Sequence, residues 1–190
     1  MVGNTANFNR IDVLRCLLKI EKPVSRSFLS KSLELGEGTI RSILDILKEK
    51  GFLVSNNAGH SLSQKGKAAL DGIKKSFAMK KISISLFPGK KAIALQIKSP
   101  KSPEKAVILR DEAVRNGAEG ALILKYDAGK LKFYEFDYNE DLKEIENELS
   151  LGKNDLVIIS YSNSYKQAEH GAIAAAVLVD SSIREFLSRI

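Results

Sequence analysis

The stretch from Ser25 to Gly51 constrains the fold most, because it predicts two helices joined by a tight turn. The first helix is expected over about residues 25–33, since the Ser25 hydroxyl can accept a hydrogen bond from a backbone N–H of the first turn. The second is expected over about residues 38–50, where four aliphatic residues recur at helical spacing: Ile40, Ile43, Leu44 and Leu47. Gly36 in the connector can adopt the left-handed conformation that such a turn often uses. The stretch therefore predicts a helix-turn-helix.

The other face of the second predicted helix is polar and basic. It carries Thr39, Arg41, Ser42, Asp45 and Lys48. Small and basic side chains near the start of such a helix can enter the major groove of double-stranded DNA. The two acids nearby, Glu37 and Asp45, would repel phosphate unless they point away from it.

Charge is divided unevenly along the 190 residues. Residues 1–80 carry 14 Lys and Arg against 7 Asp and Glu, whereas residues 81–190 carry 16 of each. The whole formal excess of +7 therefore lies in the N-terminal part. This asymmetry predicts a polyanionic partner for that part and a different role for the rest, although a basic surface that serves only solubility is the alternative.

The flanking segments complete the N-terminal domain, which is expected over residues 1–76. A first helix is predicted over residues 10–21, a short hairpin over residues 52–55 and 60–62, and a fourth helix up to residue 75. A β-hairpin placed directly after the recognition helix is the wing of a winged helix.

The run from Gly36 to Gly66 resembles prokaryotic winged-helix transcription regulators. The resemblance lies in the Gly-Glu-Gly-Thr-Ile-Arg start of the recognition helix, the Lys50-Gly51-Phe52 entry to the wing and the Leu62-Ser-Gln-Lys-Gly66 exit. It implies a DNA-binding set on the two helices and the wing: Ser25, Arg26, Thr39, Arg41, Ser42, Lys48, Asn56, Asn57, His60 and Lys65. The domain layout also resembles an uncharacterised archaeal family of winged-helix proteins with an α/β C-terminal domain.

A second domain is expected over residues 81–190, after a short linker at 76–81. Alternating apolar residues predict a hairpin over residues 82–86 and 93–97 and another over residues 121–126 and 130–136. Helices are expected from Ser102 to residue 116, from Asn139 to residue 152 and from Tyr165 to residue 189, and a strand buried on both faces over residues 155–161. This ββαββαβα order predicts an α+β sandwich with helices on one face of a mainly antiparallel sheet.

Catalytic and metal-binding patterns are nearly absent from the sequence. His60 and His170 lie in different predicted domains without the spacing of a zinc site, and Cys16 sits within an apolar helix. We therefore predict no metal, no cofactor and no enzymatic activity. The alternative hypothesis is an enzyme or an RNA-processing accessory protein that uses the winged helix as an interaction module.

A small anionic effector is predicted to bind at Ser162, Asn163, Ser164 and Tyr165. This polar run lies between a buried strand and a helix start, where backbone N–H groups attract anions. The alternative is a serine-rich loop that only caps the helix.

The sequence predicts a cytoplasmic DNA-binding regulator that acts as a homodimer. The single cysteine and the polar first residues argue for a cytoplasmic protein, and no apolar run is long enough for a membrane span. The sheet hairpins and the alanine-rich last helix are the expected dimer surface.

Overall fold

The computed structural model describes residues 8–56, 59–138 and 140–190, and it divides the chain into two compact units. Unit 1 extends to Ile73 and also includes Glu185–Ile190, and unit 2 is Lys74–Arg184. The last six residues therefore belong with the N-terminal unit, whereas the sequence reasoning placed them in the second domain. Within the described ranges, no helix combines the length and the apolar character needed to cross a bilayer.

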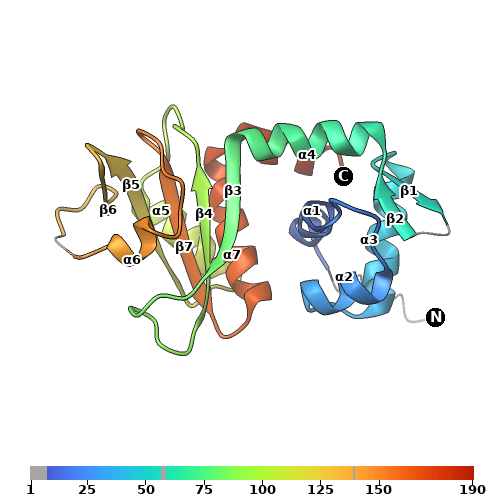
Figure 1. Ribbon diagram of the computed structural model, residues 1–190, viewed down its shortest axis with the longest axis horizontal. Helices are drawn as coiled ribbons and strands as arrows, with labels where there is room; N and C mark the ends of the chain where they lie inside the picture. Colours follow the sequence, from blue (N-terminus) through green and yellow to red (C-terminus); the bar gives the residue numbers. More distant parts are fainter. Residues whose placement is uncertain (1–7, 57–58, 139) are drawn as a thin grey trace. The chain divides into compact units, whose positions relative to one another are not determined.

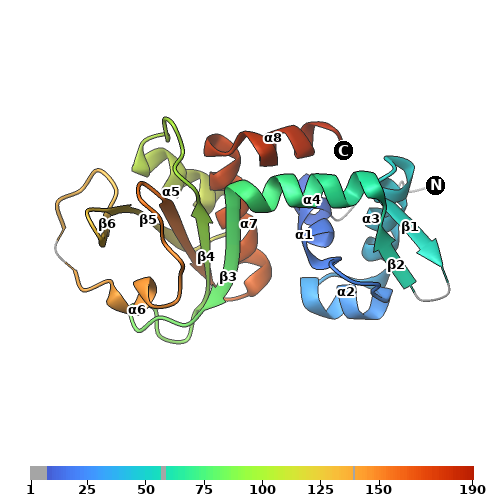
Figure 2. The same cartoon turned by 45° about the horizontal axis from the view of Figure 1, so that its top comes forward.

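Unit 1 has the predicted order of three helices, a hairpin and a fourth helix (Figure 1). Its elements are α1 (Arg10–Lys19), α2 (Arg26–Leu33), α3 (Glu37–Glu49), β1 (Leu53–Asn56), β2 (Gly59–Leu62) and α4 (Gln64–Ser76), whose last three residues belong to unit 2. β1 and β2 are antiparallel neighbours, as Figure 2 shows, and Leu53 is opposite Leu62.

The ends of the helices in unit 1 follow local chemistry, with one exception. Ser25 caps α2 as predicted, accepting a hydrogen bond from the backbone N–H of Phe28 at 3.2 Å. Gly51 follows α3 with a φ of 76°, which is the left-handed geometry that glycine adopts without strain. The prediction for Gly36 is wrong, because Gly36 has extended backbone and Glu34 takes the left-handed position at the end of α2.

The core of unit 1 contains a buried ion pair as well as aliphatic side chains. Arg15 donates to Asp12 Oδ1 at 2.8 Å and to the carbonyl of Leu33 at 3.1 Å, and both charged side chains are almost fully buried. This pair ties α1 to the end of α2. The Phe186 ring packs on Phe52 with ring centroids 5.2 Å apart, so a residue from the C-terminal end of the chain completes this core.

Unit 2 is built on a five-stranded sheet in the order β3-β4-β7-β5-β6, in which all neighbouring strands are antiparallel. The strands are β3 (Phe77–Ile82), β4 (Lys91–Ile97), β5 (Gly120–Asp127), β6 (Lys130–Phe133) and β7 (Leu156–Ser162). The helices are α5 (Ala106–Arg115), α6 (Lys143–Glu146), α7 (Tyr165–Val179) and the start of α8 (Ser181–Ser188). The predicted α+β class is confirmed.

Both faces of this sheet are covered. Helices α5 and α7 pack on one face, where α7 contacts β4 and β7 and α5 contacts β5 (Figure 1). The other face carries a second apolar cluster that includes Leu142 and Ile145 from the region of α6. Strand β7 lies in the middle of the sheet, and its run from Leu156 to Ser160 is fully buried, as the sequence predicted.

The boundary between the predicted domains is different from the expected linker. Helix α4 continues to Ser76, and β3 begins at the next residue and pairs with β4 from Phe77 opposite Ile97 to Ile82 opposite Ala92. The expected strand at residues 82–86 is therefore wrong. β3 is an edge strand with Lys80 and Lys81 in its interior. These two charges interrupt the alternation of apolar and polar residues from which a strand is predicted.

Three predicted helices are shorter than expected. Helix α5 begins at Ala106 instead of Ser102, and only Lys143–Glu146 is helical where a helix was expected from Asn139, a residue outside the described ranges. The predicted last helix is divided into α7 and α8 (Figure 2). The division is at Asp180, whose carboxylate accepts hydrogen bonds from the backbone N–H groups of Ser182 and Ile183 and so caps α8.

Candidate functional site

Helix α3 presents the polar face of unit 1. Its aliphatic stripe of Ile40, Ile43, Leu44 and Leu47 is fully buried, which leaves the intervening residues on the outside of the helix. Arg41, Ser42 and Asp45 are exposed, and Lys48 is half-buried. The amphipathic pattern of the sequence thus places the predicted base-contacting residues where a ligand can reach them.

A basic hollow of about 310 Å³ lies between α2, α3 and β2. It is lined by Arg26 from α2, by Arg41, Leu44, Asp45 and Lys48 from α3, and by His60 from β2. We call these six residues the basic hollow. Four members of the predicted DNA-binding set, Arg26, Arg41, Lys48 and His60, come together here from three separate elements.

His60 is held in a defined position within the basic hollow. Its backbone pairs with Val24 through N···O distances of 2.9 and 3.0 Å, and its Nδ1 lies 2.8 Å from the hydroxyl of Ser55. Burial lowers the pKa of His60, and the positive charges of Lys48 and Arg26 lower it further, against the opposing effect of Asp45. The neutral imidazole is therefore the favoured form beside these cations, and an added anion would raise its pKa.

Asp45 is the one acid in the basic hollow. Its carboxylate lies 3.7 Å from Lys48 Nζ, so it partly offsets the local positive charge. Glu37, the other acid of concern in the sequence, is exposed at the start of α3 and does not line the hollow.

The other predicted DNA-binding residues lie outside the basic hollow. Ser25 caps α2, and the hydroxyl of Ser42 donates to the carbonyl of Gly38 at 3.3 Å. Lys65 Nζ donates to the carbonyl of Lys50 at 2.6 Å and lies 4.5 Å from the centre of the Phe52 ring, so this lysine supports the start of β1. Two more remain on the surface, the half-buried Thr39 and the exposed Asn56. Asn57 is outside the described residues.

The predicted effector residues Ser162 to Tyr165 are bonded within unit 2. Ser164 caps α7, and the buried Ser162 hydroxyl lies 3.0 Å from Gln167 Oε1. Asn163 Oδ1 accepts from Lys90 Nζ at 2.9 Å. The ring of Tyr165 makes cation–π contacts with two lysines, whose Nζ atoms lie 3.9 Å (Lys81) and 5.6 Å (Lys91) from the ring centre. The polar groups in this run thus serve the junction between β7 and α7.

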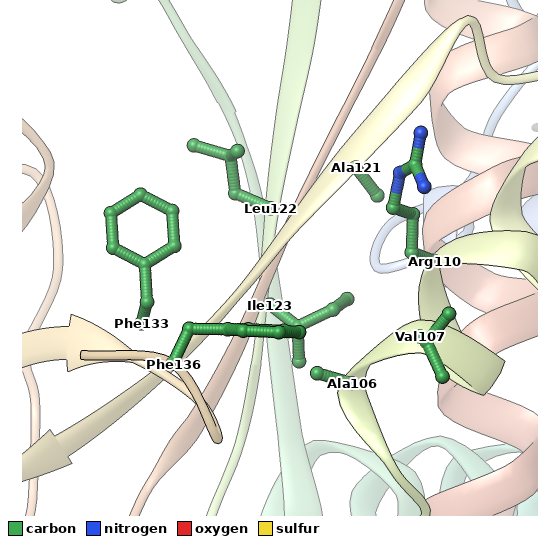
Figure 3. Close-up of a pocket in the computed structure, with 8 residues that line it drawn as sticks. All are labelled: Ala106, Val107, Arg110, Ala121, Leu122, Ile123, Phe133 and Phe136. Atoms are coloured by element: carbon green, nitrogen blue, oxygen red, sulfur yellow. The ribbon is translucent and has the colours of Figure 1, made fainter. Parts of the chain in front are cut away.

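A second hollow, which the sequence analysis did not identify, lies within unit 2 between α5, β5 and β6. It has a volume of about 230 Å³, and its lining is apolar except for Arg110: Ala106, Val107, Arg110, Ala121, Leu122, Ile123, Phe133 and Phe136 (Figure 3). We call these eight residues the apolar pocket. No pattern in the sequence joins them, because they come from α5, β5, β6 and the segment after β6, which meet only in the folded chain.

The remaining reactive candidate, Cys16, is structural. Its side chain is fully buried in α1, and this burial raises the pKa of its thiol to about 12, even though Arg15 acts in the opposite direction. The thiolate is therefore disfavoured at neutral pH, as is typical of a buried structural cysteine. Within the ranges that the structure describes, no three His, Cys, Asp or Glu side chains are grouped closely enough to hold a metal ion.

Comparison with known proteins places these two units in one family. Residues 11–68 match the family described as PH0730-like, N-terminal domain, and residues 88–180 match a domain of unknown function, DUF4443. The solved structure of the hypothetical protein PH0730 from Pyrococcus horikoshii OT3 is 30% identical to the chain, with a TM-score of 0.79. The alignment covers 94% of this chain and 99% of that one.

The chain belongs to the PH0730-like family. The resemblance to an uncharacterised archaeal family is thereby confirmed, and the PH0730-like fold extends over both units. No protein with a curated function matches the chain. The PH0730-like match covers α1 to the first turn of α4, and thus every residue of the basic hollow. The second match covers the whole apolar pocket.

Proposed function

We propose that this PH0730-like protein binds double-stranded DNA through unit 1 and regulates transcription as a homodimer. The observation that carries the proposal is the basic hollow, in which Arg26, Arg41 and Lys48 converge beside His60. Three permanent cations at the side of an exposed helix suit the phosphate backbone next to a major groove. The formal charge of +7 within residues 1–80 supports the same role.

The positions of these cations on their helices support the proposal. Arg26 is the first residue of α2, and Arg41 lies one turn into α3. The positive end of the α2 dipole also favours phosphate beside Arg26. Lys48 and His60 lie on the side toward the hairpin, and we propose that they contact a second phosphate or the minor-groove edge.

A salt titration tests this proposal directly. Fluorescence anisotropy with a mixed-sequence DNA duplex of about 30 bp measures the dissociation constant over a range of salt concentrations. If three cations neutralise phosphates, the logarithm of the affinity falls against the logarithm of salt with a slope of about −2.7 per bound chain. This slope corresponds to about 40-fold weaker binding at about 200 mM than at about 50 mM salt.

A pair of charge-matched variants locates the contact. Arg41→Gln should reduce the slope by about 0.9, because one phosphate contact is lost. Lys132→Gln removes the same charge from an exposed position on β6 in unit 2 and should leave the slope unchanged. Equal effects of the two variants, or a slope near zero for the native chain, would refute the assignment. Tighter binding to an RNA duplex of equal length would favour an RNA-processing role.

Dimer formation is a separate part of the proposal and needs its own measurement. Regulators of this type read two half-sites about 34 Å apart through two-fold symmetry. The alanines of helix α7 do not offer the apolar surface expected for this contact, because Ala168, Ala172, Ala175 and Ala176 are fully buried. Light scattering at micromolar concentration, with and without DNA, measures the assembly, and a chain that stays monomeric on DNA would rule out a dimer.

A further inference from the structure

We infer that the apolar pocket of unit 2 binds a small carboxylate with an aromatic or branched apolar body. Its role as an effector site rests on the proposed function, whereas the binding itself does not. The site is separate from the Ser162–Tyr165 junction, whose polar groups are already bonded to one another and to neighbouring side chains.

The walls of the pocket select an apolar body. Phe133 and Phe136 lie on its β6 side, and Leu122 and Ile123 extend from β5, as Figure 3 shows. The hollow exists because the buried positions where α5 faces β5 carry the small side chains of Ala106 and Ala121. Aromatic and aliphatic walls without polar groups favour a ligand part that gains by leaving water.

Arg110 supplies the one charge at the pocket and selects an anion. Its guanidinium group extends from α5 on the side opposite Phe133 (Figure 3). In the described ranges Arg110 makes no hydrogen bond and no ion pair, whereas Arg115 on the same helix lies 3.7 Å from Glu112. The planar guanidinium matches a carboxylate with two parallel hydrogen bonds, so a carboxylate is the ligand group that fits best.

The loop after β6 is anchored to the start of α5 by the carboxylate of Glu135. Glu135 accepts a hydrogen bond from the backbone N–H of Ala106 at 2.7 Å, which ties the segment after β6 to the start of α5. Tyr134 adds a weaker bond to the carbonyl of Pro103 at 3.4 Å. Glu135 also has a φ of 65°, a left-handed backbone that is held by this contact. The loop thus places Phe136 over the pocket.

The exposed ring of Phe136 is the part of the pocket that a bound ligand would cover. This side chain lines the apolar pocket and is 61% exposed. A ligand body seated between Phe133 and Phe136 would bury part of this ring. The volume of about 230 Å³ is smaller than that of most drug-sized sites, so the expected ligand is a small monocarboxylate.

The probe for this inference is 3-phenylpropionate, with its neutral amide, 3-phenylpropionamide, as the matched ligand. Saturation-transfer NMR and calorimetry on the full chain measure binding of each. We expect a dissociation constant of about 0.1–1 mM for the acid, as befits a ligand of this size. The amide should bind at least about tenfold more weakly, because a charge-assisted pair with Arg110 is lost.

Variants at exposed positions locate the site without a threat to the fold. Arg110→Gln should weaken binding of the acid about tenfold or more and leave binding of the amide unchanged. Arg115→Gln, a matched change on the same helix, should have no effect. Val107→Phe places a ring in the pocket from its half-exposed α5 side and should abolish binding of both ligands.

The outcomes separate this inference from the proposed function. No binding of 3-phenylpropionate at about 10 mM, equal binding of acid and amide, or equal effects of Arg110→Gln and Arg115→Gln would each overturn the inference. The DNA titration is run on the same variants. If the chain binds the acid at Arg110 but does not bind DNA, the ligand site stands and the DNA role is refuted. If the chain binds DNA but not the acid, the DNA role stands and the ligand site is refuted.

Discussion

Phe186 offers the sharpest test of how the chain is divided into units. This residue lies near the C-terminus, yet its side chain is only 4% exposed and packs on the fully buried ring of Phe52. Arg10 adds a hydrogen bond of 3.4 Å to the carbonyl of Leu187. If these contacts complete the core of unit 1, Phe186→Ala should destabilise unit 1 and leave unit 2 largely intact.

The expected magnitude follows from burial and ring geometry. Truncation of a buried phenylalanine to alanine costs about 3–5 kcal/mol, and the tilted ring pair contributes about 0.5–1.5 kcal/mol of that loss. With a urea dependence of about 1–2 kcal/mol per molar for a unit of this size, the midpoint of unit 1 should fall by roughly 1.5–5 M.

The chain carries a separate natural reporter for each unit. Cys16 is the single cysteine and is buried in unit 1, so the rate at which a thiol reagent modifies it reports unfolding of that unit. All five tyrosines lie in unit 2, and the chain has no tryptophan, so tyrosine fluorescence reports unit 2 alone. A urea titration of Phe186→Ala followed by both reporters measures the two midpoints in one sample.

Glu185→Ala is the matched control, because this exposed residue lies on the same helix and its ion pair is with Arg189. Removal of such a surface pair changes stability by less than about 1 kcal/mol. The reasoning is refuted if Phe186→Ala leaves the Cys16 midpoint unchanged. It is also refuted if the tyrosine midpoint shifts by the same amount, since Phe186 would then support both units equally.

Three further outcomes are expected from the structure. Arg15→Ala leaves the buried Asp12 carboxylate without its guanidinium partner and should cost about 3–5 kcal/mol, read from Cys16 modification in urea. The pKa of His60 is lowered in the free chain, so the contribution of its neutral imidazole to the stability of the folded chain is present above about pH 6.5 and is lost as pH falls. A phosphate bound beside His60 has the opposite effect and raises this pKa. DNA affinity should therefore increase from about pH 7.5 to about pH 5.5, and His60→Gln should remove this increase in anisotropy titrations. Gly171→Ala would place a Cβ 2.6 Å from that of Ala118 and 2.8 Å from Ser160 Oγ, and the resulting overpacking should cost about 1–3 kcal/mol by tyrosine fluorescence. A Gly171→Ala chain as stable as the native one would show that α7 shifts away from β7 without penalty.

Local patterns in the sequence determined much of unit 1. The spacing of Ile40, Ile43 and Leu47 buries one face of α3, and the capping hydroxyl of Ser25 and the left-handed Gly51 mark helix ends through chemistry within a few residues. The central strand β7 could also be predicted from the sequence, because a short continuous apolar run between turn residues is typical of a buried strand. Such features depend on neighbours along the chain, and sequence alone contains them.

Tertiary structure decided the features that depend on distant neighbours. Edge strand β3 has charged interior residues and forms a strand because β4 supplies its hydrogen-bonding partner. The basic hollow combines Arg26, Arg41 and His60 from three elements, and the apolar pocket exists only where α5 crosses β5 beside β6. Phe186 joins the core of unit 1 although more than a hundred residues separate it from Phe52. No periodicity records these contacts, because their free energy comes from packing between segments and not from the conformational preference of any one segment.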